Sequence, residues 1–235
     1  MRKKIIATLG PSSLTKDVVQ KMDSNGVDLF RINLSHTKAS DFNKLVLKIR
    51  NWTQKPICPD TEGSQLRLGY FSESKEEIEL FDNEIFELVS CRSNFAQGKI
   101  PLNVDNPAKV LQVGDLLEID FNQVSAQIIE IKKESVLAKI LCGGKVGQNK
   151  GIKVDRSLEL PTFTKKDIEV FKIANQLKLS TIFLSFCSNS TDVVAIRKYF
   201  DYHVDIISKV ESGSALQNLS EICKDCLLYT SPSPR

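Results

Sequence analysis

The sequence predicts an α/β protein with a parallel sheet that is interrupted by an all-β insertion. Short apolar runs closed by glycine or proline alternate with amphipathic helical segments from residue 4 to about residue 69. The same alternation resumes at Leu160-Pro161 and continues to about residue 225. Between these two parts, short strand-like segments are punctuated by Gly, Asn and Asp, which is typical of a small barrel or sandwich.

The first part of the chain is predicted to alternate between strands and helices. Strands are expected at 4–10, 27–36 and 56–63, and helices before Asn25-Gly26 and at about 39–51. Ser12 or Ser13 is expected to cap the first helix. Because strands that alternate with helices pair in parallel, this order favours a parallel sheet.

The part after residue 160 is predicted to continue the same sheet. Strands are expected at 181–186 and 205–211. The helices are expected from Thr164 to about Leu177, after an Asn189–Asp192 cap, and at about 213–224. In the Thr164 cap, Lys at the third position is expected to weaken the capping pattern.

The chain end departs from this alternation. Residues after Cys226 end in Ser-Pro-Ser-Pro-Arg, which is not expected to supply a strand, and we interpret 226–235 as a non-native tail. The predicted domains are therefore a first barrel part, a β domain and a second barrel part, with boundaries at 1–69, 70–157 and 158–225.

Composition limits the classes of partner. The chain has 32 basic and 29 acidic residues and no basic stripe with interleaved aromatics, so a nucleic-acid partner is not predicted. No apolar run approaches the roughly 20 residues that span a bilayer, so we expect no membrane segment and a cytoplasmic protein. The six cysteines are scattered and expected to be buried free thiols, and Cys223-x-x-Cys226 is weak evidence for a zinc or redox site.

Polar side chains gather at the predicted carboxyl ends of the strands. Arg31, Asn33 and Ser35 alternate with apolar residues on one strand, Asp60 and Thr61 end the next, and Arg67 follows in the loop. Functional groups of parallel sheets meet at this edge. The set suits a phosphate held by guanidinium groups beside a cation held by oxygens. Alternatively, the arginines are surface residues, and Asn33 and Ser35 cap the following helix.

Lys209 and Glu211 are spaced two apart near the end of a later strand, so they share one face. The carboxylate can hold a divalent cation, and the ammonium can neutralise charge on a phosphoryl group or an enolate oxygen. A salt bridge at the strand end is the alternative interpretation.

Several of these segments together resemble pyruvate kinase, over residues 1 to about 225. The matching segments are Ile6–Ser13, Arg31–His36, Asp60–Gly69, Asn149-Lys150-Gly151, Leu160-Pro161 with Lys166-Asp167, Phe183–Phe186 and Ile206–Glu211. The resemblance implies an incomplete (β/α)₈ TIM barrel interrupted after its third strand by a mobile β lid. It also implies the glycolytic transfer of a phosphoryl group from phosphoenolpyruvate to ADP, which gives pyruvate and ATP with Mg²⁺ and K⁺ as cofactors, and a family that is usually homotetrameric.

The resemblance also implies a role for each matched residue. Arg31 and Arg67 would grip phosphate, and His36 and Lys150 would lie near the nucleotide. Lys209 would stabilise the phosphoryl group and the enolate, while Glu211 would bind Mg²⁺. The K⁺ ligands would be Asn33, Ser35, Asp60 and Thr61.

The chain departs from the family pattern at several positions. Glu62 replaces a lysine and Ser64-Gln65 replaces Pro-Glu, while Thr37 replaces a glycine and Asp155-Arg156 replaces Pro-Gly. Reversing a charge beside a polyphosphate changes a Coulomb energy by roughly 1–4 kcal/mol. A non-catalytic pyruvate-kinase-like protein that binds a phosphorylated ligand or partner is therefore the alternative function, and another phosphoenolpyruvate-handling aldolase or lyase ranks last.

The family's later segments are not found in this sequence. Its sixth strand carries Ala-Arg-Gly-Asp-Leu-Gly, whose Asp is the other Mg²⁺ ligand. Five strand units are predicted here, whereas a closed barrel needs about eight. We therefore expect this chain to be inactive, or nearly so, when it is alone.

Overall fold

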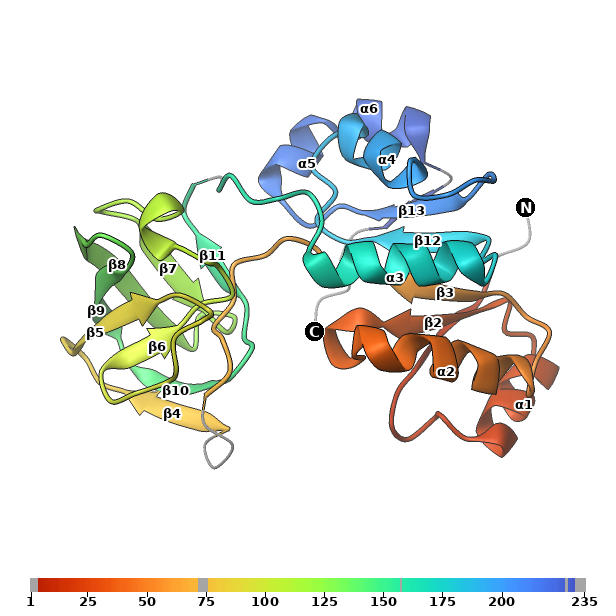
Figure 1. Ribbon diagram of the computed structural model, residues 1–235, viewed down its shortest axis with the longest axis horizontal. Helices are drawn as coiled ribbons and strands as arrows, with labels where there is room; N and C mark the ends of the chain where they lie inside the picture. The colour runs from red at the N-terminus through yellow and green to blue at the C-terminus, as the bar shows by residue number, and fades with distance from the viewer. Residues whose placement is uncertain (1–3, 72–75, 157, 227, 231–235) are drawn as a thin grey trace. The chain divides into compact units, whose positions relative to one another are not determined.

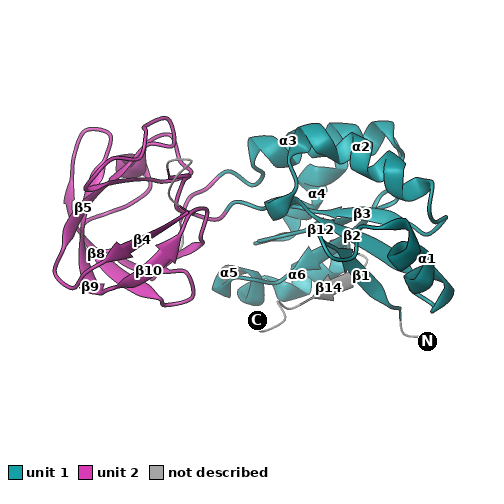
Figure 2. Ribbon diagram, turned by 90° about the horizontal axis from the view of Figure 1, so that it is seen from below, with its two compact units in different colours: residues 1–64, 161–235 teal, residues 65–160 magenta. Residues whose placement is uncertain are grey.

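A computed structural model describes residues 4–71, 76–156, 158–226 and 228–230. The chain forms two compact units (Figure 2). The α/β unit comprises residues 1–64 and 161–235, and the β unit comprises residues 65–160.

The α/β unit contains a curled, six-stranded parallel sheet, with strand order β1-β2-β3-β12-β13-β14. Within the described part of the chain, β1 and β14 each pair with one neighbour only, so the sheet is an open half-barrel. The strands are β1 (Ile6–Leu9), β2 (Leu29–Asn33), β3 (Ile57–Asp60), β12 (Thr181–Leu184), β13 (Asp205–Lys209) and β14 (Leu228–Thr230).

Helices connect these strands, and α2 and α3 lie side by side over the sheet (Figure 1). The helices are α1 (Lys16–Ser24), α2 (Ala39–Arg50), α3 (Lys165–Gln176), α4 (Ser190–Arg197), α5 (Gly213–Gln217) and α6 (Leu219–Asp225), with the 3₁₀ turn η1 (Leu34–His36). The predicted helix at 213–224 is thus two short helices.

The two faces of the sheet have different cores. On the helix side, Phe30 and Ile32 of β2 pack in one buried cluster with Phe42 and Val46 of α2. Because strand residues alternate between faces, the intervening residues lie on the opposite side. A smaller cluster buries that opposite side. It consists of Leu29, Cys58, Phe183 and Ile207.

Two sequence expectations about helix caps are wrong, and a third about the chain end is described below. Ser13 does not cap α1, which begins after Thr15, because the Ser13 hydroxyl instead accepts the Gly10 N–H at 2.9 Å. The cap of α3 is not weakened: Thr164 and Asp167 form a complete capping box, since the acidic residue stands at the third helical position. The prediction of an Asn189 cap on α4 is confirmed, with a box to Asp192.

The third error concerns the chain end. Residues 228–230 pair in parallel with β13, from Ile207 to Lys209, although no strand was expected after Cys226. Leu-Tyr-Thr precedes the prolines and retains its backbone donors, so it can pair where Ser-Pro-Ser-Pro cannot. Residues 231–235 lie outside the described residues, and the non-native origin of the tail stays a prediction.

The β unit has its own core and two sheets. Its six-stranded sheet has the order β11-β7-β8-β9-β5-β6, and β10 pairs with β4. Phe86, Leu88 and Ile119 are among the residues that fill the core. The strands are β4 (Glu77–Leu80), β5 (Ile85–Val89), β6 (Lys99–Pro101), β7 (Leu116–Ile119), β8 (Val124–Ile131), β9 (Val136–Cys142), β10 (Gly144–Gly147) and β11 (Ile152–Val154), with the 3₁₀ turn η2 (Pro107–Lys109).

Among the described residues, the search for a helix with the length and apolar character of a membrane span finds none.

Candidate active site

Charged side chains from three neighbouring regions of the sheet converge on Asp60, at the end of β3. The Asp60 Oδ1 atom lies 2.9 Å from Lys209 Nζ on β13, and its Oδ2 atom lies 3.6 Å from Arg31 Nη1 on β2. The Asp60 side chain is only 3% exposed and that of Lys209 only 15%. A carboxylate this buried is tolerated because cations compensate its charge.

Glu211 completes the group, just beyond β13. Its Oε1 atom is 3.7 Å from Lys209 Nζ, and its Oε2 atom accepts the Phe186 N–H at 3.0 Å. Phe186 holds a left-handed backbone conformation with φ of 53°, which is uncommon for a bulky side chain and typical of functional turns. The order Arg31, Asp60, Lys209, Glu211 therefore alternates positive and negative charge, and we call these four side chains the charge cluster.

The charge cluster leaves one buried donor free. The Arg31 Nε atom is buried and has no hydrogen-bond partner, while its Cζ atom lies 5.9 Å from the centre of the Phe183 ring. A buried N–H without an acceptor is unfavourable by about 1–3 kcal/mol. An anion bound beside Arg31 would remove this penalty.

Asn33 lies directly beside Asp60, because the two residues are register partners on β2 and β3. Its Oδ1 atom accepts the Ser35 N–H at 2.9 Å and so caps η1. The capping alternative is thus correct for Asn33, although the capped element is this 3₁₀ turn and not α2. Capping uses one lone pair of Oδ1 and leaves the other for a cation.

Ser185, just after β12, fixes the end of β3 and was not predicted as a site residue. Its hydroxyl contacts Asp60 Oδ1 at 3.2 Å and donates to the Thr61 carbonyl oxygen. Its N–H donates to Thr61 Oγ1 at 2.8 Å. The only sequence signal was its position inside the Phe183–Phe186 match, since one serine after a strand has no pattern of its own.

The oxygen atoms at the ends of β2 and β3 are ligands of the kind that hard cations prefer. Asn33, Ser35, Asp60 and Thr61 offer oxygens with one negative charge among them, which matches a monovalent ion in kind. The described residues contain no group of three or more His, Cys, Asp or Glu side chains that would hold a metal. A Mg²⁺ ion would therefore have Glu211 with phosphate oxygens and water, as is usual for this ion.

His36, Arg67 and Lys150 are the remaining predicted residues. His36 is exposed at the end of η1. Arg67 and Lys150 belong to the β unit, where Arg67 Nη1 donates to the Asn149 carbonyl at 3.2 Å and Lys150 Nζ lies 3.0 Å from Asp120. These two residues are thus neighbours within the β unit, and their roles with the charge cluster stay predictions.

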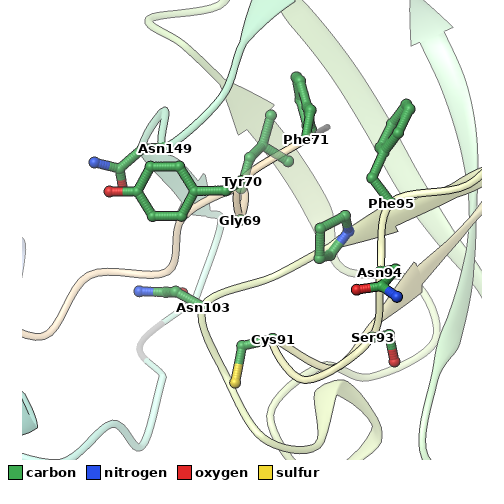
Figure 3. Close-up of a pocket in the computed structure, with 11 residues that line it drawn as sticks. Gly69, Tyr70, Phe71, Cys91, Ser93, Asn94, Phe95, Asn103 and Asn149 are labelled. Carbon is green, nitrogen blue, oxygen red and sulfur yellow. The ribbon is translucent and has the colours of Figure 1, made fainter. Parts of the chain in front are cut away.

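A hollow of about 550 Å³ lies in the β unit but lacks the chemistry of a phosphate site (Figure 3). Aromatic and amide side chains dominate its lining, and Figure 3 shows Phe71 and Phe95 on one side of it. Among the described residues, its lining includes no Lys, Arg, Asp or Glu, whereas the charge cluster of the α/β unit has all of these.

Of the described cysteines, Cys58 and Cys187 are buried, and the expectation of buried thiols is wrong for Cys91, Cys142 and Cys223, which are exposed. Burial raises the pKa of Cys58 well above its ordinary value, and the Asp60 charge raises it further while Arg31 lowers it. Burial likewise raises the pKa of Cys187 to about 11 and that of Cys226 in the same direction. These thiols are therefore protonated near neutral pH, which agrees with a structural role.

Two of the departures from the family pattern form new ion pairs. Glu62 Oε1 lies 3.9 Å from Lys166 Nζ, in the loop after β3. Arg156 donates to both carboxylate oxygens of Asp115, at 2.7 and 2.8 Å, and also to the Val110 carbonyl. The first pair adjoins the predicted site, and the second stabilises the β unit.

Comparison with known proteins identifies the family. The sequence profile described as "Pyruvate kinase, barrel domain" matches residues 1–228. The chain is 28% identical over 230 residues to a pyruvate kinase of Thermotoga maritima, covering 94% of this chain and 49% of the relative. A pyruvate kinase of Agrobacterium vitis is 26% identical over 95% of this chain and 47% of its own length.

A plant protein gives a similar result. Plastidial pyruvate kinase 2 of Arabidopsis thaliana is 26% identical, covering 93% of this chain and 39% of the relative. The chain thus spans at most about half the length of these curated relatives. The chain belongs to the pyruvate kinase family.

Proposed function

We propose that this chain contributes to phosphoryl transfer between phosphoenolpyruvate and ADP, giving pyruvate and ATP in glycolysis. The observation that carries the proposal is the charge cluster, in which Lys209 is held by Asp60 and Glu211 at 2.9 and 3.7 Å. Phosphoryl transfer requires positioning and charge neutralisation more than covalent help from the protein. A buried ammonium between two carboxylates supplies a fixed charge in a site of low dielectric constant.

We propose that the complete fold is a (β/α)₈ barrel in which the β unit is a lid. Six parallel strands support this, because β3 pairs directly with β12 although residues 65–160 intervene in the sequence. An insertion between two adjacent strands leaves the sheet continuous and leaves the insertion able to move. Closure of such a lid would exclude the water that would otherwise accept the phosphoryl group.

For the cations, we propose that K⁺ is held by oxygens from Asn33, Ser35, Asp60 and Thr61, and that Mg²⁺ is held by Glu211. When bound, these ions neutralise phosphate charge and orient the reacting groups. The protein's own contribution is to fix the oxygens, and the register pairing of Asn33 with Asp60 supports this arrangement.

For the substrates, we propose that Arg31 binds the phosphate and that Lys209 stabilises the transferring phosphoryl group and the enolate oxygen. The partnerless Nε atom of Arg31 supports the first role, since an anion would satisfy it. Arg67 would add a second guanidinium, while His36 and Lys150 would contact the nucleotide.

We propose that the 235-residue chain is inactive, or nearly so, by itself, and that a longer, cytoplasmic homotetramer is the active form. The chain covers about half of its relatives, and the described acidic residues near Lys209 include only Asp60 and Glu211 as partners. An enzyme that needs a second carboxylate for Mg²⁺ would lose most of its rate without it.

A coupled lactate dehydrogenase assay tests the proposal. The chain and its longer gene product are each supplied with phosphoenolpyruvate, ADP, Mg²⁺ and K⁺. We expect the longer protein to turn over. This turnover should disappear in the Lys209→Met variant but not in the exposed helix variant Lys172→Met. Full activity of the Lys209→Met protein would contradict the assignment of Lys209, and robust turnover by the 235-residue chain would contradict its proposed inactivity.

The second candidate is a pyruvate-kinase-like protein that binds a phosphorylated ligand without turnover. Glu62 favours it, because this anion lies near the strand end that carries Asp60, with Lys166 Nζ at 3.9 Å from its carboxylate. Glu62→Lys in the longer protein separates the two candidates. If the wild type is active and Glu62→Lys changes its turnover only a few-fold, the result supports the enzyme. If the wild type binds phosphoenolpyruvate without turnover, the result supports the binding protein.

A further inference from the structure

The Lys166-Asp167 motif matches the family sequence, but the proposed function gives it no role. Both residues lie in the first turn of α3, after the Thr164 cap. Their side chains contact two different loops of the α/β unit. These loops are the ones that follow β2 and β3. The four residues of the proposed K⁺ site lie at the ends of these two strands and in the loops directly after them.

Asp167 holds the loop after β3. Its side chain is fully buried, and its carboxylate accepts the N–H groups of Glu62 at 2.8 Å and Gly63 at 3.1 Å. It also accepts the Thr164 N–H at 3.2 Å, which is the ordinary capping-box contact. Capping explains the Thr164 contact but not the other two, which come from residues 105 and 104 positions away in sequence.

The contact with Glu62 fixes the orientation of a proposed K⁺ ligand. The Glu62 N–H and the Thr61 carbonyl oxygen belong to one planar peptide group, so holding one end directs the other. Asp167 Oδ1 thus holds the Thr61-Glu62 peptide, while Oδ2 holds the next peptide group through the Gly63 N–H. Ser185, just after the neighbouring strand β12, donates to the same carbonyl oxygen.

Lys166 acts in the same way on the loop after β2. Its Nζ atom donates to the Leu34 carbonyl oxygen. The Leu34 carbonyl shares a peptide plane with the Ser35 N–H, which in turn donates to Asn33 Oδ1 at 2.9 Å. The side-chain ammonium therefore orients the peptide that holds the Asn33 amide.

We propose that Lys166 and Asp167 are positioning residues that orient the peptide groups of Leu34-Ser35 and Thr61-Glu62, and thereby the oxygens of the K⁺ site. This inference rests on the proposed function for the identity of the ion. The orientation of the peptides is a separate claim that can be measured without any ligand.

Amide hydrogen exchange on the 235-residue chain tests the orientation. Asp167→Asn places an amide N–H₂ opposite backbone donors, so exchange at Glu62 and Gly63 is expected to quicken at least about tenfold. Thr164→Ala is the matched control, because it removes the acceptor of the Asp167 N–H at 3.0 Å but leaves the loop contacts. Equal acceleration in both variants would overturn the proposal and leave Asp167 as a helix cap.

A KCl titration, with NaCl at matched ionic strength as reference, tests the link to the ion. The readout is the unfolding midpoint of the α/β unit, followed by the fluorescence of Trp52, the chain's single tryptophan. Asp167→Asn and Lys166→Met are each expected to raise the half-saturating K⁺ concentration by about tenfold, as loss of an outer-shell contact does. Thr164→Ala should leave it unchanged.

The outcomes separate the two claims. If wild type responds alike to K⁺ and Na⁺, the proposed K⁺ site fails, while the exchange experiment still decides the positioning role. If wild type prefers K⁺ and all three variants shift the midpoint equally, the positioning proposal fails and the proposed function stands. Should Asp167→Asn fail to fold, Lys166→Met against Thr164→Ala decides by exchange at Ser35.

Discussion

Each unit of the molecule contains a buried carboxylate paired with a cation, but the two pairs differ in completeness. In the β unit, both carboxylate oxygens of Asp115 accept hydrogen bonds from Arg156, which also donates to the Val110 carbonyl. In the α/β unit, Asp60 is shared by Lys209 and Arg31, and the Arg31 Nε atom has no partner. The pair of the β unit is thus hydrogen-bonded on both carboxylate oxygens, whereas the cluster of the α/β unit keeps one guanidinium N–H without an acceptor.

The electrostatic setting agrees with this difference. The Nε and Nη2 atoms of Arg156 both donate to the Asp115 carboxylate, and this hydrogen bonding raises the pKa of Arg156. The charge cluster instead spreads two positive and two negative groups over three strand ends. The first arrangement lies within the β unit, whereas the second has an unpaired Arg31 N–H at the carboxyl edge of the parallel sheet, where ligands of parallel sheets bind.

The largest expected effect is that of Lys209→Met. Removing the ammonium leaves two carboxylates with Arg31 at 3.6 Å from Asp60 as the remaining cation. The free energy of unfolding of the α/β unit is expected to fall by about 3–5 kcal/mol, as for a broken buried pair. Urea unfolding followed by Trp52 fluorescence measures it, with Lys172→Met as the surface control.

Arg156→Met is expected to destabilise the β unit by about 2–4 kcal/mol, because Asp115 would be left buried without its bidentate partner. Hydrogen exchange of β7 and β11 measures the loss. Trp52 lies in the α/β unit, so its unfolding curve should stay unchanged. A change in ligand binding by the charge cluster would contradict the division between a structural pair and a functional one.

Gly63→Ala is expected to cost about 1–3 kcal/mol and to disturb the charge cluster. Gly63 has φ of 71°, and a Cβ atom there would lie 2.7 Å from Phe186 Cδ2 and 2.9 Å from Ser185 Cβ. Gly26 has φ of 91° with open space around it, so Gly26→Ala controls for the backbone strain alone. Equal effects of the two variants would exclude a specific contact with the Ser185-Phe186 turn.

The smallest expected effect concerns pH. The Cys187 pKa is raised to about 11 from an ordinary value of 9.0, so its contribution to stability is complete below about pH 9 and is lost as pH rises through 11. Unfolding of the α/β unit, followed between pH 8 and 11 by Trp52 fluorescence, should show this decline. Cys187→Ala should flatten it, and an unchanged slope in the variant would place the titration elsewhere.

Much of the α/β fold was predictable because its signals are local. Alternation of Phe30, Ile32 and Leu34 with Arg31 and Asn33 indicated one polar face, and the structure has that face. Parallel order followed from the alternation of strands and helices. The sequence also indicated that Lys209 and Glu211 share a side of β13, which the 3.7 Å separation agrees with.

The parts that were missed depend on contacts between distant segments. Asp167 looks like an ordinary capping residue in sequence, and its two bonds to Glu62 and Gly63 arise only when α3 docks on the sheet. Ser185 contacts Thr61 in the same manner across 124 positions. The short strand β14 was missed because the prolines after it dominate the local signal.

Calorimetric titration of phosphoenolpyruvate into the 235-residue chain, with Mg²⁺ and K⁺ present, tests the incomplete charge cluster most directly. We predict saturable binding by the wild type that Lys209→Met weakens by at least about tenfold, or 1.4 kcal/mol, while Arg156→Met leaves it unchanged. Equal affinity of the wild type and Lys209→Met proteins would show that the ligand is not held by the cluster around Asp60.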